Sequence, residues 1–183
     1  MQVGIDEVGR GCLAGPLVIG AVILKEPIEG LKDSKLLSKK RRLELSEIIY
    51  REALAATLGW VWPHEIDILG LTEATRLAIT RAIDLITIEY TSILIDGNTN
   101  YLKDNPKAIT MIKADNLIPE VSAASIIAKV ARDSYMEEIA EYFPEYSFSD
   151  HVGYGTASHM AAISSYGPCV LHRLSFKPLS NLV

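Results

Sequence analysis

Short apolar runs of strand length recur along this chain and alternate with longer segments of helical rhythm, and this alternation strongly limits the possible folds. The apolar pattern predicts strands at residues 1–6, 17–24, 55–61, 92–95 and 108–112. Helices are predicted at residues 38–53, 72–90, 119–142 and 156–166, with a short one beginning at Pro63. Alternating strands and helices favour an α/β sheet with helices on its faces.

Residues typical of element boundaries support this pattern. Ser38 and Thr72 are predicted N-caps, because a hydroxyl can accept from backbone N–H groups of the first helical turn. Pro119 suits the first turn of a long helix, where its missing N–H removes no hydrogen bond. The glycine-rich segment 9–16 permits unusual backbone angles, so we expect it to join the first two strands as a hairpin-like pair.

Acidic residues follow three of the expected strands. Asp6 and Glu7 end the first, Asp96 ends the fourth, and Asp115 lies shortly after the fifth. Binding sites in α/β sheets gather at strand ends, and clustered carboxylates repel one another unless hard cations such as Mg²⁺ or Mn²⁺ bind them. Taken singly, Asp96 and Asp115 could each belong only to a turn. Asp6 and Glu7 interrupt an apolar strand and indicate a metal site more directly.

Glu7 poses a geometric problem for such a site. Consecutive strand residues point to opposite faces of a sheet, so Asp6 and Glu7 should diverge. We expect both to reach one site only where the strand ends or bulges at Glu7, which Gly9 would permit.

A polar stripe marks the helix predicted at residues 119–142. Its members are spaced three, four and four residues apart, so they share one helix face: Ser122, Ser125, Lys129 and Asp133. The surrounding residues are small and apolar, as in a helix packed closely on a sheet. The stripe therefore either faces the acidic site or forms a solvated helix face.

Bulk properties limit the class of protein. The 183 residues are 49% hydrophobic and 22% charged, which predicts one globular domain spanning residues 1–183. A net charge of −5 argues against coating of nucleic acid by bulk charge, but not against an enzyme with a local basic surface. No apolar run approaches the roughly 18–20 residues of a membrane span, and no signal peptide is evident. We expect a cytoplasmic protein without membrane contact. Cys12 and Cys169 are expected to be reduced thiols.

The chain also contains a series of motifs: Gly4-Ile5-Asp6-Glu7-Val8-Gly9-Arg10-Gly11 with Leu13-Ala14-Gly15-Pro16, Asp33-Ser34-Lys35, Asp96-Gly97-Asn98, Lys113-Ala114-Asp115, Ser122-Ala123-Ala124-Ser125-Ile126-Ile127-Ala128-Lys129 with Arg132-Asp133, Gly153-Tyr154-Gly155-Thr156, and His172-Arg173 with Ser175-Phe176. In this order they resemble the signature of ribonuclease HII, the type 2 ribonuclease H, over nearly the whole chain. The sequence departs from the common family pattern at Cys12, where Pro is frequent, and at Leu36 and Val152, where Lys is frequent. The last two departures bear on phosphate affinity.

The resemblance implies a ribonuclease H-like fold: a central mixed five-stranded sheet flanked by helices, with a helical, substrate-contacting C-terminal part at about residues 145–183. It implies that the catalytic acids, which bind two divalent ions, Mn²⁺ or Mg²⁺, are Asp6, Glu7, Asp96 and Asp115. The implied substrates are RNA–DNA hybrids and duplex DNA containing ribonucleotides. The enzyme would cut the RNA strand, or cut 5′ to a single ribonucleotide as in ribonucleotide excision repair, leaving 3′-hydroxyl and 5′-phosphate ends.

The resemblance also implies the substrate contacts Gly9, Arg10, Gly11, Lys35, Ser125, Tyr154 and Arg173. Glycines let a backbone approach a ribose closely, and the Tyr154 phenol can bond the 2′-hydroxyl that distinguishes RNA from DNA. Lys35, Lys129 and Arg173 are candidate phosphate contacts. Each of the three could instead be a solvated charge, and Tyr154 a packed surface tyrosine.

Three other functions remain open from sequence. The chain could be a non-catalytic hybrid-binding module, a metal-dependent phosphatase on an α/β sheet, or an enzyme like ribonuclease HIII that needs runs of ribonucleotides. The first is disfavoured because a pure binder has no need to gather carboxylates near phosphates. The start at the first catalytic strand differs from ribonuclease HIII, which usually carries an extra N-terminal domain. We expect a monomer, and no tail for docking on a sliding clamp is evident.

Overall fold

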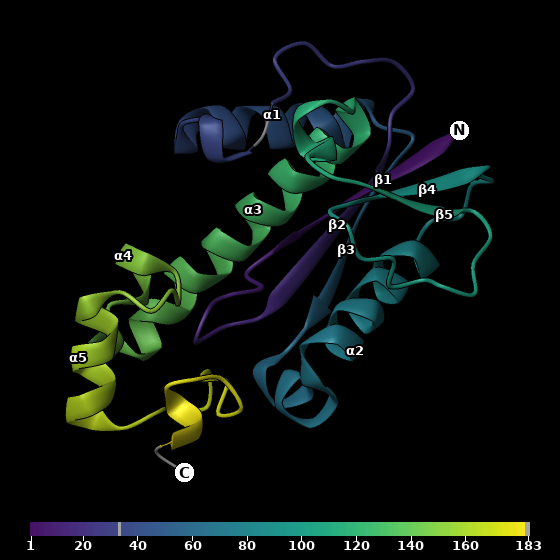
Figure 1. Cartoon of the computed structure of the whole chain (residues 1–183). Coiled ribbons are helices and arrows are strands. Elements are labelled where there is room, and N and C mark those ends of the chain that lie inside the picture. Colours follow the sequence, from purple (N-terminus) through teal and green to yellow (C-terminus); the bar gives the residue numbers. More distant parts are fainter. Residues whose placement is uncertain (33, 182–183) are drawn as a thin grey trace.

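The computed structural model describes residues 1–32 and 34–181, which form one mixed sheet with helices against it (Figure 1). The strands are β1 (Gln2–Val8), β2 (Leu17–Ile23), β3 (Ala55–Val61), β4 (Ser92–Asp96) and β5 (Ala108–Met111). Their order across the sheet is β3-β2-β1-β4-β5. β2 pairs antiparallel with β1 and β3, whereas β1–β4 and β4–β5 are parallel. The expected hairpin of the first two strands and the five-stranded mixed sheet are both confirmed.

The helices are α1 (Lys39–Glu52), α2 (Pro63–Asp84), α3 (Pro119–Ile139), α4 (Phe148–His151) and α5 (Ala157–Tyr166). Short 3₁₀ turns lie at Ser34–Leu36, Ala114–Asn116, Ala140–Tyr142, Pro144–Tyr146 and Leu179–Asn181. The Ser38 side chain accepts a hydrogen bond from the Arg41 N–H at 3.2 Å, so the predicted N-cap of α1 is confirmed.

The two faces of the sheet bury different helices. Val3 and Ile5 of β1 pack against α2, in a core that includes Ile66 and Ala78. On the opposite face Val22 of β2 packs against α1 and α3, with Leu45, Ile49, Ala123 and Ile127 among its neighbours. Figure 1 shows α3 crossing this second face along its length. Because strand residues alternate between faces, the odd residues of β1 face α2 and the even ones face α3.

Glycines let α3 lie directly on the sheet. A Cβ on Gly4 would come within 2.3 Å of the Glu120 carbonyl carbon, and one on Gly20 within 2.2 Å of the Ala124 oxygen. No side chain fits at such separations, so glycine is required at both positions. This close approach brings the next turn of α3, with Ser125, beside Asp6.

Two predicted boundaries are wrong. β1 continues through Val8 instead of ending at Asp6. The helix predicted from Thr72 ends at Asp84 and not near residue 90, since the β-branched Thr87 and Ile88 that follow are weaker helix formers. The predicted break between the helix from Pro63 and the one from Thr72 is confirmed, because Gly70, within α2, has non-helical backbone angles with φ at 73°.

The segment after α3 forms a second, smaller hydrophobic cluster. Met136, Tyr146, Phe148 and Ile163 are buried there together with Leu13 of the loop after β1. The C-terminal part is helical, as expected, and α4 and its flanking 3₁₀ turns add elements that the sequence pattern did not predict. None of the helices within residues 1–32 and 34–181 has the length and hydropathy needed to cross a bilayer.

Candidate active site

A cavity of about 230 Å³ opens at the C-terminal end of β1. Its lining includes the end of β1, the following glycine loop, one face of α3 and the turn after β2: Asp6, Glu7, Val8, Gly9, Arg10, Gly11, Ser34, Lys35, Ser125, Lys129 and Tyr154. Most residues that the sequence assigns to substrate contact therefore meet the first two predicted acids in one place.

Asp6 is the most buried carboxylate of this cavity, at 6% exposure. One of its oxygens accepts the Glu7 N–H at 2.8 Å. Burial, together with the nearby charges of Glu7 and Asp96, raises the pKa of Asp6 to about 7, against the lowering effect of a hydrogen bond from Ser125. Folding has thus brought several negative groups together in a place where water solvates them poorly.

Glu7 reaches the cavity without the break in the strand that the sequence argument required. β1 stays in continuous register with β2, with Glu7 opposite Ile19 and Val8 opposite Val18. The Glu7 side chain leaves the opposite face from Asp6 and lies 3.6 Å from the Arg10 guanidinium, which also donates to the Tyr101 hydroxyl. Burial raises the pKa of Glu7, and Arg10 opposes this shift. Because the site lies at the C-terminal end of β1, side chains from both faces of the sheet line it.

Asp96 and Asp115 lie at the ends of the neighbouring parallel strands, as predicted. Asp96 ends β4 and accepts the Ala114 N–H at 2.7 Å. Asp115 is 5% exposed in the 3₁₀ turn after β5, and its carboxylate lies 3.9 Å from the Lys35 ammonium. Both acids line a second cavity, of about 630 Å³, to which Lys35 also contributes. Lys35 therefore lies where the two cavities adjoin.

The charge of Asp96 connects the two cavities, because it acts on both acids at the end of β1. Asp96 raises the pKa of both Asp6 and Glu7. Among the residues that the structure describes, no three His, Cys, Asp or Glu side chains lie close enough to form a metal-binding group. The chemistry of the donor set still fits a hard divalent cation, because all four are carboxylates and a cation would relieve their repulsion.

The glycine loop and the Tyr154 loop are held together by backbone contacts. The Gly153 carbonyl accepts the N–H groups of Leu13, at 2.9 Å, and Ala14, at 3.2 Å. Tyr154 follows directly and is 42% exposed at the cavity. Burial of the remainder raises the pKa of the Tyr154 phenol, so it stays protonated at neutral pH and can donate a hydrogen bond.

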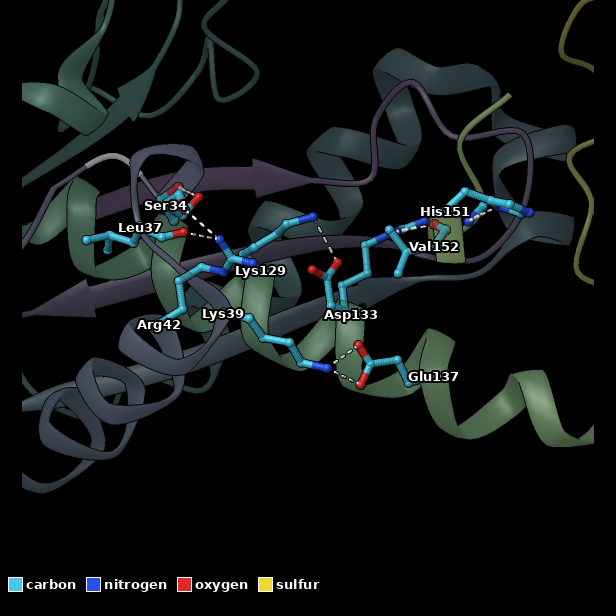
Figure 2. Close-up of polar contacts among 12 residues, drawn as sticks. Ser34, Leu37, Lys39, Arg42, Lys129, Asp133, Glu137, His151 and Val152 are labelled. Carbon is cyan, nitrogen blue, oxygen red and sulfur yellow. Dashed lines mark hydrogen bonds and ion pairs between the residues drawn. The ribbon is translucent and has the colours of Figure 1, made fainter. Parts of the chain in front are cut away.

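The polar stripe of α3 faces the site rather than solvent. Ser122 donates to the Asp115 carbonyl at 2.6 Å, and Ser125 bonds the Ser34 hydroxyl at 2.9 Å. Lys129 lines the cavity and pairs with Asp133 at 2.9 Å (Figure 2). Asp33, the first residue of the Asp33-Ser34-Lys35 motif, lies outside the described residues.

Arg173 does not lie where a phosphate contact would. Its side chain is fully buried and donates to the carbonyls of Gly15, at 2.8 and 3.1 Å, and Arg10, at 3.0 Å. Arg132 of α3 is also fully buried, and it donates to three carbonyls of the same two loops: Ala14, Pro16 and Val152. Sequence reasoning placed Arg173 at the substrate and gave Arg132 no role. The available signal for Arg132 was its place just after the otherwise small, apolar run at residues 123–131.

The cysteines are both free, as expected, with Cys12 buried and Cys169 half-buried.

Comparisons with known proteins agree with this geometry. The sequence pattern of the Ribonuclease HII family matches residues 3–179. Ribonuclease HII of Paracidovorax citrulli (strain AAC00-1) is 46% identical over 182 residues, which are 98% of this chain and 75% of that protein.

Two solved structures share the fold over almost the entire chain. Ribonuclease H2 from Pyrococcus horikoshii OT3 superposes with a TM-score of 0.84 at 28% identity, covering 99% of this chain and 96% of that one. Ribonuclease HII from Archaeoglobus fulgidus, solved in complex with PCNA, gives 0.82 at 28% identity, covering 100% and 96%. The sheet and its helices are therefore a ribonuclease H-like fold. The chain belongs to the ribonuclease HII family, and it is a metal-dependent endoribonuclease that acts on RNA–DNA hybrids.

Proposed function

We propose that this ribonuclease cuts 5′ to single ribonucleotides embedded in duplex DNA as well as within the RNA strand of hybrids. It would use two divalent ions, Mn²⁺ or Mg²⁺, and leave 3′-hydroxyl and 5′-phosphate ends. The observation that carries the proposal is the shared cavity, in which Asp6 and Glu7 face the same space as Gly9-Arg10-Gly11 and Tyr154. A group that can read a 2′-hydroxyl thus lies beside the acids.

Asp6, Glu7, Asp96 and Asp115 would hold the ions, since all four carry the hard oxygen donors that such cations prefer. When bound, two ions supply an activated water and stabilise the leaving oxygen. The chain's own residues position the substrate. Lys35, 76% exposed where the two cavities adjoin, would contact a phosphate.

Selectivity for a single ribonucleotide would come from the Tyr154 phenol and the backbone of residues 9–11. The Arg10 side chain is held by an ion pair with Glu7 and by a hydrogen bond to the Tyr101 hydroxyl. These contacts fix the orientation of the central residue of the glycine loop. Its flanking glycines leave the backbone open to a ribose. Tyr154 then offers a protonated donor to the 2′-hydroxyl, the group that DNA lacks.

The test uses three duplexes: all DNA, DNA with one ribonucleotide, and a long RNA–DNA hybrid. With Mn²⁺ or Mg²⁺ we expect a nick 5′ to the single ribonucleotide and cleavage of the hybrid, both abolished by chelator. End mapping should find a 3′-hydroxyl and a 5′-phosphate. Cleavage of the hybrid alone would indicate an enzyme that needs ribonucleotide runs and would contradict the proposal.

Three single substitutions test the acids. Asp6→Asn and Asp96→Asn should each lower kcat by at least about 10³-fold, the scale on which removal of a main catalytic electrostatic group acts. Asp84→Asn is the matched control, because it makes the same chemical change at an exposed position at the end of α2. Full activity of Asp6→Asn would remove that residue from the proposed metal site.

The single-domain organisation and the monomeric state remain proposals. Backbone bonds join the C-terminal part to the body of the protein, including Arg173 N–H to the Leu13 carbonyl at 2.8 Å. We therefore expect one unfolding transition. Light scattering coupled to gel filtration should give the mass of a single chain.

A further inference from the structure

The turn that carries Lys35 is fixed by contacts on both sides. On one side the Ser34 hydroxyl, 2% exposed, lies 2.9 Å from the Ser125 hydroxyl of α3, and Ser125 in turn bonds Asp6. On the other side the turn leads directly into α1 through its N-cap, Ser38. Lys35 itself extends away from these anchors towards the acids.

Arg42, on the second turn of α1, bonds back to this turn (Figure 2). Its guanidinium donates to the Leu37 carbonyl at 2.6 Å and to the Ser34 carbonyl at 3.0 Å. Both bonds come from the same nitrogen, which lies between the two ends of the turn. Figure 2 shows the Arg42 guanidinium pointing towards the backbone of Ser34 and Leu37.

α1 is in turn fixed to α3 at its first residue. Lys39 pairs with both oxygens of Glu137, at 2.6 and 2.7 Å (Figure 2). Arg42 therefore acts from a support that is itself joined to the helix lining the cavity. The contacts run from α3 through Glu137 and Lys39 to Arg42, and return to α3 through Ser34 and Ser125.

We propose that Arg42 is a positioning residue for substrate binding: its bonds to the carbonyls of Ser34 and Leu37 hold the Lys35 ammonium over the acidic cavity. The inference rests on the proposed role of Lys35 as a phosphate contact. A lysine side chain has four rotatable bonds, so its charge is useful at one place only when its backbone is fixed. If the turn moves, the apparent affinity for substrate falls in proportion to the fraction of time that Lys35 spends in the binding position.

The neighbouring Arg41 is a matched control. It carries the same charge one residue earlier, its side chain is 42% exposed, and it pairs with Glu44 at 3.1 Å instead of with the turn. Arg41→Gln and Arg42→Gln therefore remove equal charge from the same helix, and only the second removes the bonds to the turn carbonyls.

The experiment measures KM and kcat on the single-ribonucleotide duplex over a range of salt concentrations. For Arg42→Gln we expect KM to rise about tenfold, with kcat changed less than about twofold, because binding and not chemistry is affected. The slope of log KM against log salt should fall by about 1, as it should for Lys35→Gln, since one phosphate contact is lost. Arg41→Gln should leave KM within about twofold of wild type.

The double variant decides whether Arg42 acts through Lys35. In the Lys35→Gln background, Arg42→Gln should add less than about twofold to KM, because positions that act through one contact are not additive. Arg42→Lys should recover part of the loss, since an ammonium can donate to one of the two carbonyls. Should Arg42→Gln fail to fold by circular dichroism, Arg42→Lys takes its place, with a smaller rise in KM and the same small change in kcat expected.

Three results would overturn the inference. The first two are a full additional loss in the Lys35→Gln background and equal effects of Arg41→Gln and Arg42→Gln. A normal KM and salt slope for Lys35→Gln would overturn it as well, by removing the contact through which Arg42 acts. Failure of the proposed function is distinguishable from these, because wild-type protein would then not nick the single-ribonucleotide duplex at all.

Discussion

At the scale of one residue, the position of Asp6 suits metal binding but lowers the stability of the metal-free fold. Its carboxylate is 6% exposed and lies near the charges of Glu7 and Asp96, which together with burial raise its pKa to about 7. Such an arrangement destabilises the folded chain until a cation offsets it. The position in the sequence explains why: Asp6 ends a buried run of β1, the central strand, next to the cavity at its C-terminal end, so the side chain cannot turn to solvent.

Asp6→Asn should therefore stabilise the metal-free protein. The amide keeps an oxygen that can accept the Glu7 N–H and removes the repelled charge. At pH 8 we expect a gain of about 1 kcal/mol, seen as a rise of about 2–4 °C in Tm by differential scanning calorimetry. Adding Mn²⁺ should raise the Tm of wild type and have little effect on the variant. Asp84→Asn is the control, and a fall in the Tm of metal-free Asp6→Asn would contradict this account.

Tyr154 has a role in selectivity that a second substitution can test. Removing the ring by Tyr154→Ala should cost about 10–100-fold in kcat/KM on the single-ribonucleotide duplex, the range for a lost hydrogen bond and ring contact to the substrate. The loss on long hybrids should be much smaller, because neighbouring ribonucleotides offer other contacts. Tyr154→Phe keeps the ring and removes only the hydroxyl, so its loss of kcat/KM should measure the hydrogen bond alone. Tyr166→Phe, at an exposed position of α5, is the control. Equal losses on the two substrates would remove the role in selectivity.

At the scale of elements, two buried arginines determine how the loops around the cavity meet. Arg132 projects from α3 and Arg173 from the segment after α5. Their N–H groups donate to carbonyls of the glycine loop and of Val152. Burial lowers the pKa of Arg173 to about 10, so it remains charged at neutral pH. Carbonyl groups without such donors would be left unsatisfied inside the protein.

Arg173→Met should consequently destabilise the fold strongly. It leaves the Arg10 and Gly15 carbonyls without their charged donor, and the expected loss is about 3–5 kcal/mol in the free energy of unfolding by urea. Arg173→Lys should recover less than half of this loss, since one ammonium cannot reproduce the planar fork of donors. Arg76→Met, at an exposed position of α2, should stay within about 0.5 kcal/mol of wild type. A stable Arg173→Met with weakened substrate binding would instead favour a phosphate contact.

At the scale of the whole molecule, a buried histidine network joins the C-terminal part to the Tyr154 loop. Cys169 N–H donates to His172 Nδ1 at 2.9 Å, so the hydrogen of neutral His172 lies on Nε2, facing His159 Nε2 at 3.1 Å. His159 Nδ1 then donates to the Tyr154 carbonyl at 2.9 Å. The network is satisfied with both rings neutral. Protonation of His159 would place two N–H groups against each other.

The protein should accordingly lose stability in mild acid. Burial, with the nearby His159, lowers the pKa of His172 from 6.5 to about 4. Between these values the unfolded chain binds a proton that the folded chain does not, so stability falls as pH drops from about 6.5 to 4. The raised pKa of Asp6 acts in the opposite direction, and comparison with a His172→Gln variant removes that contribution from the difference.

Urea unfolding at several pH values checks this prediction. Wild type should lose more stability than His172→Gln between pH 7 and pH 4.5, whereas His64→Gln, at an exposed position of α2, should follow wild type. Parallel curves for wild type and His172→Gln would show that the network does not carry the pH dependence.

Trp60 lies in β3 and stacks on Trp62, so tryptophan fluorescence reports on unfolding of the sheet. If the C-terminal part unfolds together with the sheet, the unfolding curves from fluorescence and from circular dichroism should coincide in a single transition.

Local sequence alone determined the elements of this protein and the placement of its acids. Strand length, apolar runs and boundary residues such as Ser38 and Pro119 act over a few residues, so the strands, the longer helices, the break near Gly70 and the carboxylates at strand ends could be predicted. The end of α2 and the short helix α4 were missed because local signals there are weak and packing decides them.

Tertiary structure decided which side chains face the substrate and which support them. Glu7 reaches the cavity from the opposite face to Asp6 because the cavity lies beyond the C-terminal end of β1, where the packing of other elements, and not β1 itself, determines which side chains share one space. Nothing in the sequence next to Arg173 or Lys35 shows which of the two basic side chains is buried. Only the packing of the C-terminal segment buries the first against backbone carbonyls, and only a turn anchored by α1 and α3 leaves the second exposed above the acids.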